Sequence, residues 1–448
     1  MRKLLLLLAL VLLPGCRQAL DVSDLLAAGP MLGYSTQREV FIWVQTRRPA
    51  RVQIRYWPEE KPGFARTTPP VRTTVEGDLV AHLRASNLDP GVRYKYRVWI
   101  NGTQAERPYP MRFQTEPLWQ WRSGPPEFSV AIGSCAYIND EPFDRPGEPY
   151  GGGYEIFPNI LRKLPDLMIW LGDNVYLREV DWTSPGQMAY RYAHTRRTPE
   201  MQPLLANVHN YALWDDHDYG PDNSDRSFVL KGAALQIFQR YWGNPSYGLP
   251  ELAGTFGHFS WGDADFFLLD DRTYRHADSA PESEAKAMWG PAQMDWLIDA
   301  LTASRATFKI VANGSQILNP FPRSENAIRF PSERQRLLDA LQQRGIEGVV
   351  LLTGDRHFTE LQRLERPGSY PLYEYTSSPL TSGVSAPRGD EESNPQRVEG
   401  TLLRERNFGI LTFSGPVDER VLTLKAFSSA GEPRWEHRIY EQKLRKPL

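Results

Sequence analysis

One short stretch of the chain, residues 214–225, is rich in side chains that bind cations. From Trp214 to Asp225 it holds five carboxylates together with one histidine, His217, and one asparagine, Asn223. Carboxylates packed this closely repel one another unless protons or cations neutralise them. A solvated acidic run is the alternative interpretation, but such runs seldom contain Trp, Tyr and a Gly-Pro pair. The stretch therefore predicts a catalytic loop whose side chains bind metal ions.

Six apolar runs elsewhere in the chain end abruptly in polar residues. Near-continuous apolar runs of this length are typical of buried strands. In open α/β sheets, ligands bind beyond the carboxyl ends of such strands, so the residues after these runs are expected to meet. The runs are residues 128–132, 166–171, 210–213, 265–269, 308–311 and 348–352.

The residues that follow these runs include six candidate metal ligands: Cys135, Asp173, Tyr176, Asp216, Asp355 and His357. An all-oxygen set would favour calcium or magnesium. Thiolate, phenolate and imidazole favour a transition metal, and phenolate favours ferric iron. The set predicts a binuclear site with one hard-cation position and one iron-like position, with Asp173 able to bridge them. Taken singly, Cys135, Tyr176 and His357 also have ordinary interpretations as a buried thiol, a core aromatic and a satisfied loop histidine.

Two cations held a few ångströms apart suit in-line displacement at phosphorus. One cation activates water, and both stabilise charge on the phosphoryl oxygens. His217 lies inside the acidic run, where neighbouring carboxylates favour its protonated form. As a cation it could protonate the leaving alcohol, so we predict a catalytic role for it.

Arg272 follows the fourth apolar run. Its planar guanidinium has the geometry that grips phosphate through two hydrogen bonds, so it is a candidate catalytic and substrate-binding residue. A salt bridge to the adjacent Asp270 or Asp271 is an equally weighted alternative. Asn174, next to the candidate ligand at position 173, and Asn223 complete the predicted substrate-binding residues.

The chain divides into an all-β part and an α/β part. Strands alternating at period two, such as 39–45, 51–57 and 93–100, predict an antiparallel immunoglobulin- or fibronectin-type sandwich over residues 28–117. Residues 125–448 predict an α/β domain. Its expected helices span 154–164, 228–242, 290–301 and 331–343, and residues 407–438 are expected to return to the sheet as closing strands.

The first sixteen residues predict a targeting segment. Arg2 and Lys3 precede an apolar run, Leu4 to Leu13, that is too short to span a bilayer. The run ends in a Leu-Pro-Gly-Cys sequence that resembles a bacterial lipobox, so Cys16 is the predicted lipidation site of an exported, membrane-anchored lipoprotein. A plain signal peptide cleaved elsewhere is the alternative. With Cys16 lipidated, Cys135 would have no disulfide partner in an oxidising compartment.

The overall charge argues against a dedicated nucleic-acid binder. The chain has 448 residues with 52 basic and 54 acidic side chains, whereas nucleic-acid binding requires a basic excess. This length allows two or three domains with a large buried core.

Four motifs in order resemble those of the PhoD-like alkaline phosphatases of the metallophosphoesterase superfamily. They are Gly133-Ser-Cys135, Gly172-Asp-Asn-Val-Tyr176, Trp214-Asp-Asp-His-Asp-Tyr-Gly-Pro221 and Gly354-Asp-Arg-His357. The resemblance covers about residues 125–440 and implies a four-layer α/β/β/α core that hydrolyses phosphate mono- and diesters with iron and calcium bound. It also departs from the family's usual pattern at Leu177, Phe358 and the order Asp222-Asn223.

Carried over by motif, the resemblance implies a role for each candidate ligand. Ferric iron would be held by Cys135, Asp173, Tyr176, Asp355 and His357, and calcium by Asp173, Asp216 and Asn223. His217 would take the place of the superfamily's catalytic histidine. The leading prediction is thus an exported, metal-dependent phosphatase or phosphodiesterase. A phospholipid or cell-wall phosphodiesterase, and a surface-binding lipoprotein with a structural metal site, are the alternatives.

Overall fold

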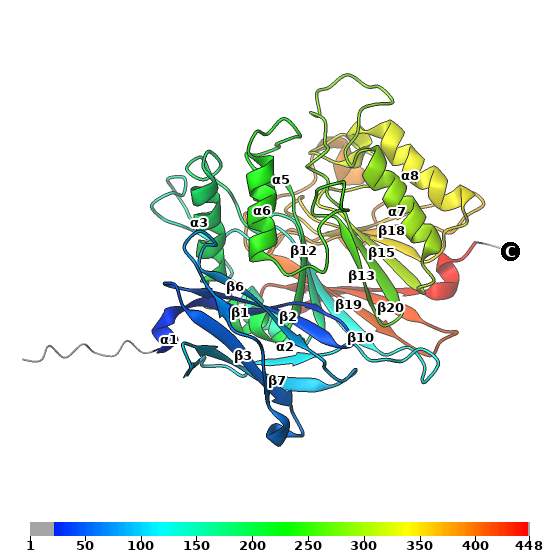
Figure 1. The fold of residues 1–448 in the computed structure, drawn as a ribbon. Coiled ribbons are helices and arrows are strands. Elements are labelled where there is room, and N and C mark those ends of the chain that lie inside the picture. The colour runs from blue at the N-terminus through cyan, green and yellow to red at the C-terminus, as the bar shows by residue number, and fades with distance from the viewer. Residues whose placement is uncertain (1–21, 447–448) are drawn as a thin grey trace, which may run out of the picture.

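The computed structural model describes residues 22–446 and consists of two β-rich parts packed together (Figure 1). The predicted signal segment 1–16, with Cys16, lies outside the described residues. Within residues 22–446, no helix has the length and apolar character needed to cross a bilayer.

The N-terminal part is an antiparallel two-sheet structure, as predicted. One sheet has the order β1-β2-β6, and the other has the order β4-β3-β7-β8, with β5 on β3 and β9 on β7. Alternate residues of β3 and β7 are buried, which places their apolar side chains in a core between the sheets. The elements are α1 Val22–Leu25, β1 Leu26–Ser35, β2 Glu39–Thr46, β3 Arg51–Pro58, η1 Pro62–Phe64, β4 Arg66–Thr67, β5 Val71–Arg72, β6 Val80–Ser86, β7 Arg93–Ile100, β8 Thr103–Ala105 and β9 Arg112–Gln114.

The larger part contains two six-stranded sheets, with the orders β12-β11-β10-β19-β20-β21 and β13-β14-β15-β16-β18-β17. All six predicted strands are present, and residues 407–438 do return to the first sheet. The strands are β10 Phe128–Gly133, β11 Leu167–Leu171, β12 His209–Leu213, β13 Gly257–Trp261, β14 Ala264–Leu268, β15 Phe308–Ala312, β16 Val349–Thr353, β17 Glu360–Leu364, β18 Leu372–Thr376, β19 Asn407–Ser414, β20 Val421–Ser428 and β21 Pro433–Tyr440.

Helices cover the outer faces of the two sheets, which completes the predicted four-layer core (Figure 1). The four predicted helices are present as α2, α6, α7 and α8, whereas α3 and α4 did not stand out in the sequence. The helices are α2 Ile156–Arg162, α3 Pro185–Arg196, α4 Gln202–Asn207, α5 Asp216–Tyr219, α6 Lys231–Tyr241, α7 Pro291–Ala303 and α8 Pro331–Gln343, with short 3-10 turns η2 Ala327–Arg329, η3 Gly389–Ser393 and η4 Glu441–Leu444.

The central strands are apolar along their whole length because both of their faces are buried. In β11, Leu167 and Ile169 pack between the sheets, whereas Met168 and Trp170 pack under the helices. Strands β10, β11 and β12 are parallel, and so are β14, β15, β16 and β18. Parallel strands end at one edge of a sheet, so the polar residues that follow them are brought together.

Direct hydrogen bonds join the N-terminal part to the larger one. The Tyr96 hydroxyl donates to the Ala206 carbonyl at 2.7 Å, and the backbone N–H of Ser35 donates to the Tyr211 hydroxyl at 3.1 Å. The partners lie in or beside α4 and β12, directly before residues 214–225. The N-terminal sandwich therefore supports the strand from which the acidic stretch emerges.

Candidate metal centre

Four of the predicted ligands have a backbone conformation that only glycine adopts readily. The φ angles are 61° at Cys135, 52° at Asp173, 68° at Asp355 and 57° at His357. A positive φ is uncommon for other residues and costs on the order of 1–3 kcal/mol each. All four residues lie within four positions of the end of a strand. Strain of this kind persists only where the surrounding structure holds it, and it is typical of functional sites.

The first ligand cluster contains Cys135, Asp173 and His357. One ligand atom of each lies within 4.8 Å of the other two. The Tyr176 hydroxyl lies between two of them, at 3.1 Å from Asp173 Oδ2 and 3.1 Å from His357 Nε2. The structure thus brings together thiol, carboxyl, phenol and imidazole, as the sequence predicts.

The second cluster contains Asp173, Asp216 and His217, again within 4.8 Å of one another. Asp173 belongs to both clusters, and its predicted role as a bridge between two cations stays a prediction. The His217 ring packs against the Tyr176 ring at a tilt of 33°, with the ring centroids 4.3 Å apart, and its buried Nδ1 has no hydrogen-bond partner among residues 22–446. Asp355 faces the same cavity but is not part of either cluster, and its carboxylate accepts a hydrogen bond from Ser324 Oγ at 2.8 Å.

Burial disfavours the charged forms of these ligands. It raises the pKa of the Cys135 thiol to about 12 and that of the Tyr176 phenol above its usual range. Burial, and then the charge of Asp216, raise the pKa of Asp173 well above its usual range. Burial also lowers the pKa of His357 to about 4. A metal cation reverses this preference for the thiol, phenol and carboxyl because it stabilises their anions, and it binds the neutral imidazole.

Asp215 and Asp218 shape the loop rather than face the cavity. Asp218 Oδ2 accepts the backbone N–H of Asp215 at 3.0 Å, which caps the short helix α5. Its Oδ1 accepts the backbone N–H of Asn174 at 3.0 Å and that of Val175 at 3.3 Å. These bonds tie the loop after β11 to the loop after β12, so Asp173 and Asp216 are held in fixed relation.

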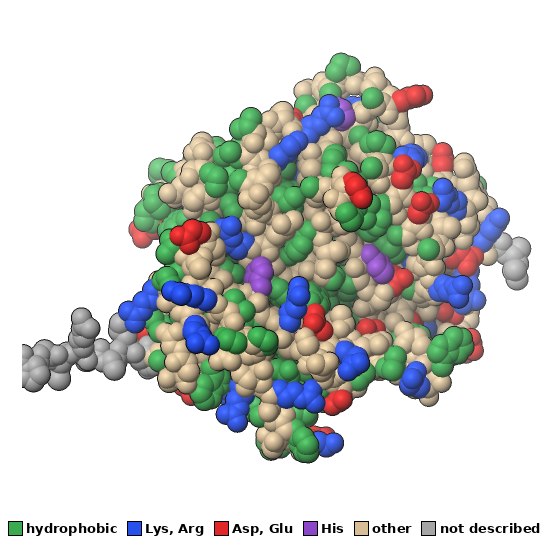
Figure 2. Space-filling view, viewed as in Figure 1, with side chains coloured by type: hydrophobic (Ala, Val, Ile, Leu, Met, Phe, Trp, Pro, Cys, Tyr) green, Lys and Arg blue, Asp and Glu red, His purple; other side chains and the backbone are tan. Residues whose placement is uncertain are grey.

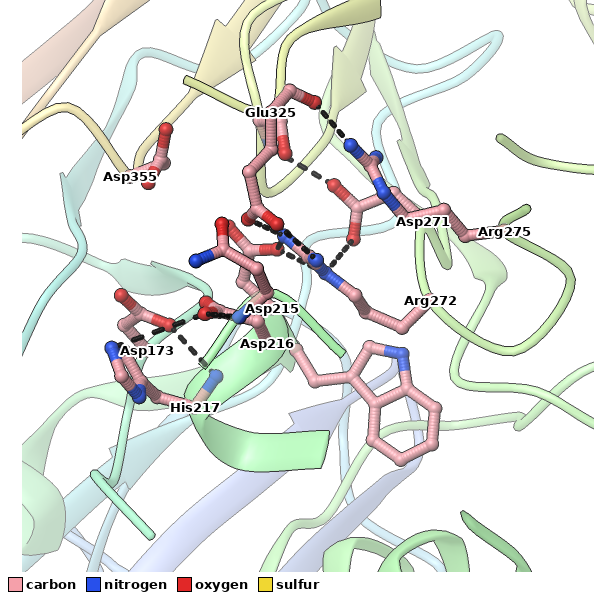
Figure 3. Close-up of polar contacts among 12 residues, drawn as sticks. Asp173, Asp215, Asp216, His217, Asp271, Arg272, Arg275, Glu325 and Asp355 are labelled. Atoms are coloured by element: carbon pink, nitrogen blue, oxygen red, sulfur yellow. Dashed lines mark hydrogen bonds and ion pairs between the residues drawn. The ribbon is translucent and has the colours of Figure 1, made fainter. Parts of the chain in front are cut away.

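The structure contradicts the predicted phosphate-gripping role of Arg272 (Figure 3). Its side chain is 0% exposed, and Nε donates to Asp215 Oδ1 at 2.6 Å while Nη1 donates to Glu325 Oε1 at 3.0 Å. Asp271 is a weaker partner, with its Oδ1 3.7 Å from Arg272 Nε. The salt-bridge alternative is therefore correct, but with two distant carboxylates as the main partners. With its donors engaged and no surface on the cavity, Arg272 cannot reach a substrate.

Asn174 does not line the cavity, whereas Asn223 does. Asn174 is 1% exposed, and its Nδ2 donates to the Leu213 carbonyl at 2.7 Å, away from the cavity. It therefore supports the loop and does not bind substrate. Asn223 lines the cavity, and its backbone N–H donates to Asp216 Oδ2 at 2.8 Å. Its predicted contact with calcium or substrate stays a prediction.

The ligand clusters open into a cavity of about 520 Å³. Three arginines that the sequence analysis missed line it: Arg323, Arg356 and Arg388. Arg356 is paired with Glu391 at 2.9 Å, but the guanidinium groups of Arg323 and Arg388 have no hydrogen-bond or ion-pair partner among residues 22–446. Arg356 lies inside the Gly-Asp-Arg-His motif, which could have drawn attention to it. The other two lie in irregular loops without a recognisable pattern.

Small polar groups complete the surroundings of the first cluster. Ser378 Oγ donates to Cys135 Sγ at 3.1 Å, and the Tyr150 hydroxyl lies 3.1 Å from His357 Nδ1. The Tyr150 contact fixes the orientation of the imidazole ring, whose Nε2 faces Tyr176. Metal-bound histidines are commonly oriented by such a second hydrogen bond.

The α/β/β/α core, with ligand-type side chains gathered beyond the ends of its parallel strands, is the fold predicted from the resemblance to the metallophosphoesterase superfamily. The chain belongs to the PhoD-like phosphatase family, whose model matches residues 130–418. Residues 23–118 match a second family, described as a domain of unknown function (DUF7800). The predicted resemblance is confirmed. The predicted boundaries 28–117 and 125–448 stay predictions.

Individual relatives agree with this assignment. Alkaline phosphatase D of Bacillus subtilis (strain 168) is 21% identical over 379 residues, which cover 70% of this chain and 62% of that protein. This chain therefore spans less than two thirds of the length of that relative.

Two solved structures share the fold. One described as the structure of PhoD superimposes with a TM-score of 0.76 and 19% identity, over 95% of this chain and 92% of that one. The purple acid phosphatase PPD1 from yellow lupin (Lupinus luteus) seeds gives a TM-score of 0.66 and 13% identity, over 92% and 74% of the chains. Because both identities are below 25%, these matches concern the fold alone, and they confirm the predicted fold.

The burial of Arg272 leads to a prediction about stability. Replacing Arg272 with Met leaves Asp215 and Glu325 buried without their cation, so we expect the free energy of unfolding to fall by about 3–5 kcal/mol. Denaturant unfolding measures this. The exposed Arg438→Met variant is the control and should unfold like the wild type. Normal stability of Arg272→Met combined with a raised KM would show that Arg272 contacts substrate after all.

Proposed function

We propose that the chain is an exported phosphoric ester hydrolase that uses iron and calcium held by the two clusters. The observation that supports it best is the sharing of Asp173 between a mixed thiol–phenol–imidazole cluster and a carboxylate cluster. A mixed set of this kind suits two different cations side by side. Two cations with a shared carboxylate suit displacement at phosphorus.

The residues around the cavity fit such a pair. Cys135, Tyr176 and His357 would hold the iron together with Asp173 and Asp355, and Asp216 with Asn223 would complete the calcium site. When bound, the two cations supply Lewis acidity to the phosphoryl oxygens and activate a water molecule. The fit rests on Asp173, a buried carboxyl group that both clusters share and that pairs with no Lys or Arg among residues 22–446.

His217 is positioned to move a proton. It lies on the cavity wall with its side chain 13% exposed, and Nε2 is 3.4 Å from Asp222 Oδ1. The tilted contact with the Tyr176 ring restricts the orientation of the imidazole. From this position the protonated ring donates to the oxygen of the leaving alcohol, and Asp222 stabilises the charged ring.

Arg323 and Arg388 take over the role first predicted for Arg272. Both line the cavity mouth, and neither guanidinium is engaged by another group among residues 22–446. A free guanidinium beside a phosphate site can offer two parallel hydrogen bonds to phosphate oxygens. These two residues therefore hold the substrate phosphate against the metal-binding wall.

The proposed location is the outer side of a bacterial membrane, with Cys16 lipidated. This rests on the apolar run from Leu4 to Leu13 and the Leu-Pro-Gly-Cys sequence that ends it. A lipid anchor would keep the open cavity close to phosphodiesters of the envelope. Comparing monoester with diester rates distinguishes a general phosphatase from a phospholipid or cell-wall phosphodiesterase.

Hydrolysis is tested with p-nitrophenyl phosphate and bis(p-nitrophenyl) phosphate at alkaline pH. We expect turnover that a chelator abolishes and metal addition restores. His217→Ala should lower kcat by about 10²–10⁴-fold with unchanged metal content, because proton transfer is lost while the ligands remain. His258→Ala, which removes a histidine of β13, is the control. A metal-loaded wild type that hydrolyses neither ester would leave the binding-lipoprotein alternative.

The identity of the first metal is tested by its colour. Iron bound to the Tyr176 phenolate gives a visible charge-transfer band, so the purified protein should be coloured and Tyr176→Phe should lose the band. Tyr137→Phe is a matched control. The Tyr137 ring centroid lies 5.0 Å from that of Tyr176, but its hydroxyl donates a hydrogen bond to Asp144 instead of facing the ligand cluster. A colourless, active protein containing only zinc or manganese would refute the iron assignment and leave hydrolysis intact.

Substrate binding is tested at the two free arginines. Arg323→Gln and Arg388→Gln should each raise KM for the monoester about tenfold or more, since a hydrogen bond to a charged group is lost. Thermal unfolding should be unchanged because neither guanidinium has a hydrogen-bond or ion-pair partner among residues 22–446. The exposed Arg305→Gln variant is the control. Unchanged KM in the double variant would exclude both arginines from phosphate binding.

A further inference from the structure

The outward face of β3 and β7 in the N-terminal domain is strongly basic. The side chains on this face alternate with buried ones along both strands, which form an antiparallel pair. In Figure 2, basic side chains are spread over the lower part of the molecule, where this domain lies. The basic residues of the face are Arg51, Arg55, Arg93, Lys95, Arg97 and, from β9, Arg112.

Acidic residues neutralise this face only in part. Glu59 pairs with both Lys95, at 3.3 Å, and Arg112, at 3.5 Å. Arg55 and Arg97 have no ion pair with a carboxylate among residues 22–446. The whole chain has a formal net charge of −2, so this concentration of positive charge is local and not a property of the composition.

Arg55 and Arg97 are direct cross-strand partners, an arrangement that is unfavourable for like charges. Each guanidinium lies over an indole ring of the same face: Arg55 is 5.9 Å from the Trp99 ring and Arg97 is 5.8 Å from the Trp57 ring. These contacts offset part of the repulsion. The four side chains line a hollow of about 230 Å³. An anionic group in this hollow would remove the remaining repulsion.

The described chain begins at the edge of the same sheet. The backbone N–H of Glu106, directly after β8, donates to Ser23 Oγ at 3.0 Å. Strand β8 is the edge strand next to β7. The residues between Cys16 and Val22 span at most about 20 Å even when fully extended. A lipid on Cys16 would therefore hold this face close to the bilayer.

We propose that the outward face of β3 and β7 docks on an anionic lipid bilayer, with a lipid phosphate in the hollow between Arg55, Arg97 and the two tryptophans. Arginine and lysine are attracted to the negative surface potential of anionic lipids, and tryptophan favours the headgroup region. The surface is separate from the metal centre, so its function does not depend on hydrolysis. Docking would add a second membrane contact to a single lipid anchor.

The test uses the chain from Arg17 onward, which contains every described element but no lipid. Its partitioning is measured by sedimentation with vesicles of phosphatidylcholine alone or mixed with phosphatidylglycerol. We expect binding to the anionic vesicles only, weakened by added salt. Arg55→Gln/Arg97→Gln should reduce the partition coefficient about 30-fold, since each basic residue near the surface contributes to the attraction.

The matched control removes two positive charges from a different surface. Arg336→Gln/Arg344→Gln, in α8 and directly after it, changes the net charge equally and should bind like the wild type. Equal loss of binding in this control, or equal binding to neutral vesicles, would overturn the proposal. So would binding of inorganic phosphate without binding to vesicles, because the hollow would then be a site for free anions. Hydrolysis of a soluble phosphodiester should be unchanged in both variants, which separates this result from the proposed function.

Discussion

The cost of burying carboxylates governs this structure. Asp173, Asp215, Asp216 and Glu325 are all buried within one group of loops beyond the strand ends. Each buried charge costs several kcal/mol unless a partner compensates it. Arg272 compensates Asp215 and Glu325 on one side of the group. No Lys or Arg among residues 22–446 pairs with Asp173. Neutralising its carboxylate therefore requires a proton or a metal cation.

The backbone is arranged around the same constraint. The N–H of Cys135 donates to the Gly172 carbonyl at 3.2 Å, and that of Ala136 donates to the Asp173 carbonyl at 2.8 Å. These bonds join the loops after two neighbouring parallel strands at the points where φ is positive. Both loops are thereby fixed to each other independently of any bound ion. The ligands are preorganised, so binding a cation need not order the chain.

The gathering of the candidate ligands at the strand ends could be predicted because its signal is local: a buried apolar run followed by polar residues. The role of Arg272 could not, because its partners Asp215 and Glu325 lie 57 and 53 residues away in the chain. Arg323 and Arg388 lie in irregular loops, where no periodicity reveals which way a side chain points. Helix α3 was missed for a related reason, since it buries arginine and threonine side chains that interrupt its apolar pattern.

Two of the departures from the family's motifs, Leu177 and Phe358, are at buried positions. The Phe358 side chain, which follows His357, is 1% exposed and does not line the cavity. The Arg356 guanidinium lies 4.9 Å from the centre of the Phe358 ring. Leu177 is likewise buried, and its backbone N–H donates to the His217 carbonyl at 3.1 Å. Phe358 thus packs beneath the Arg356 guanidinium, and Leu177 holds the His217 backbone through its own N–H. Both side chains are buried next to residues that line the cavity, so these two departures lie beneath the cavity surface and not on it.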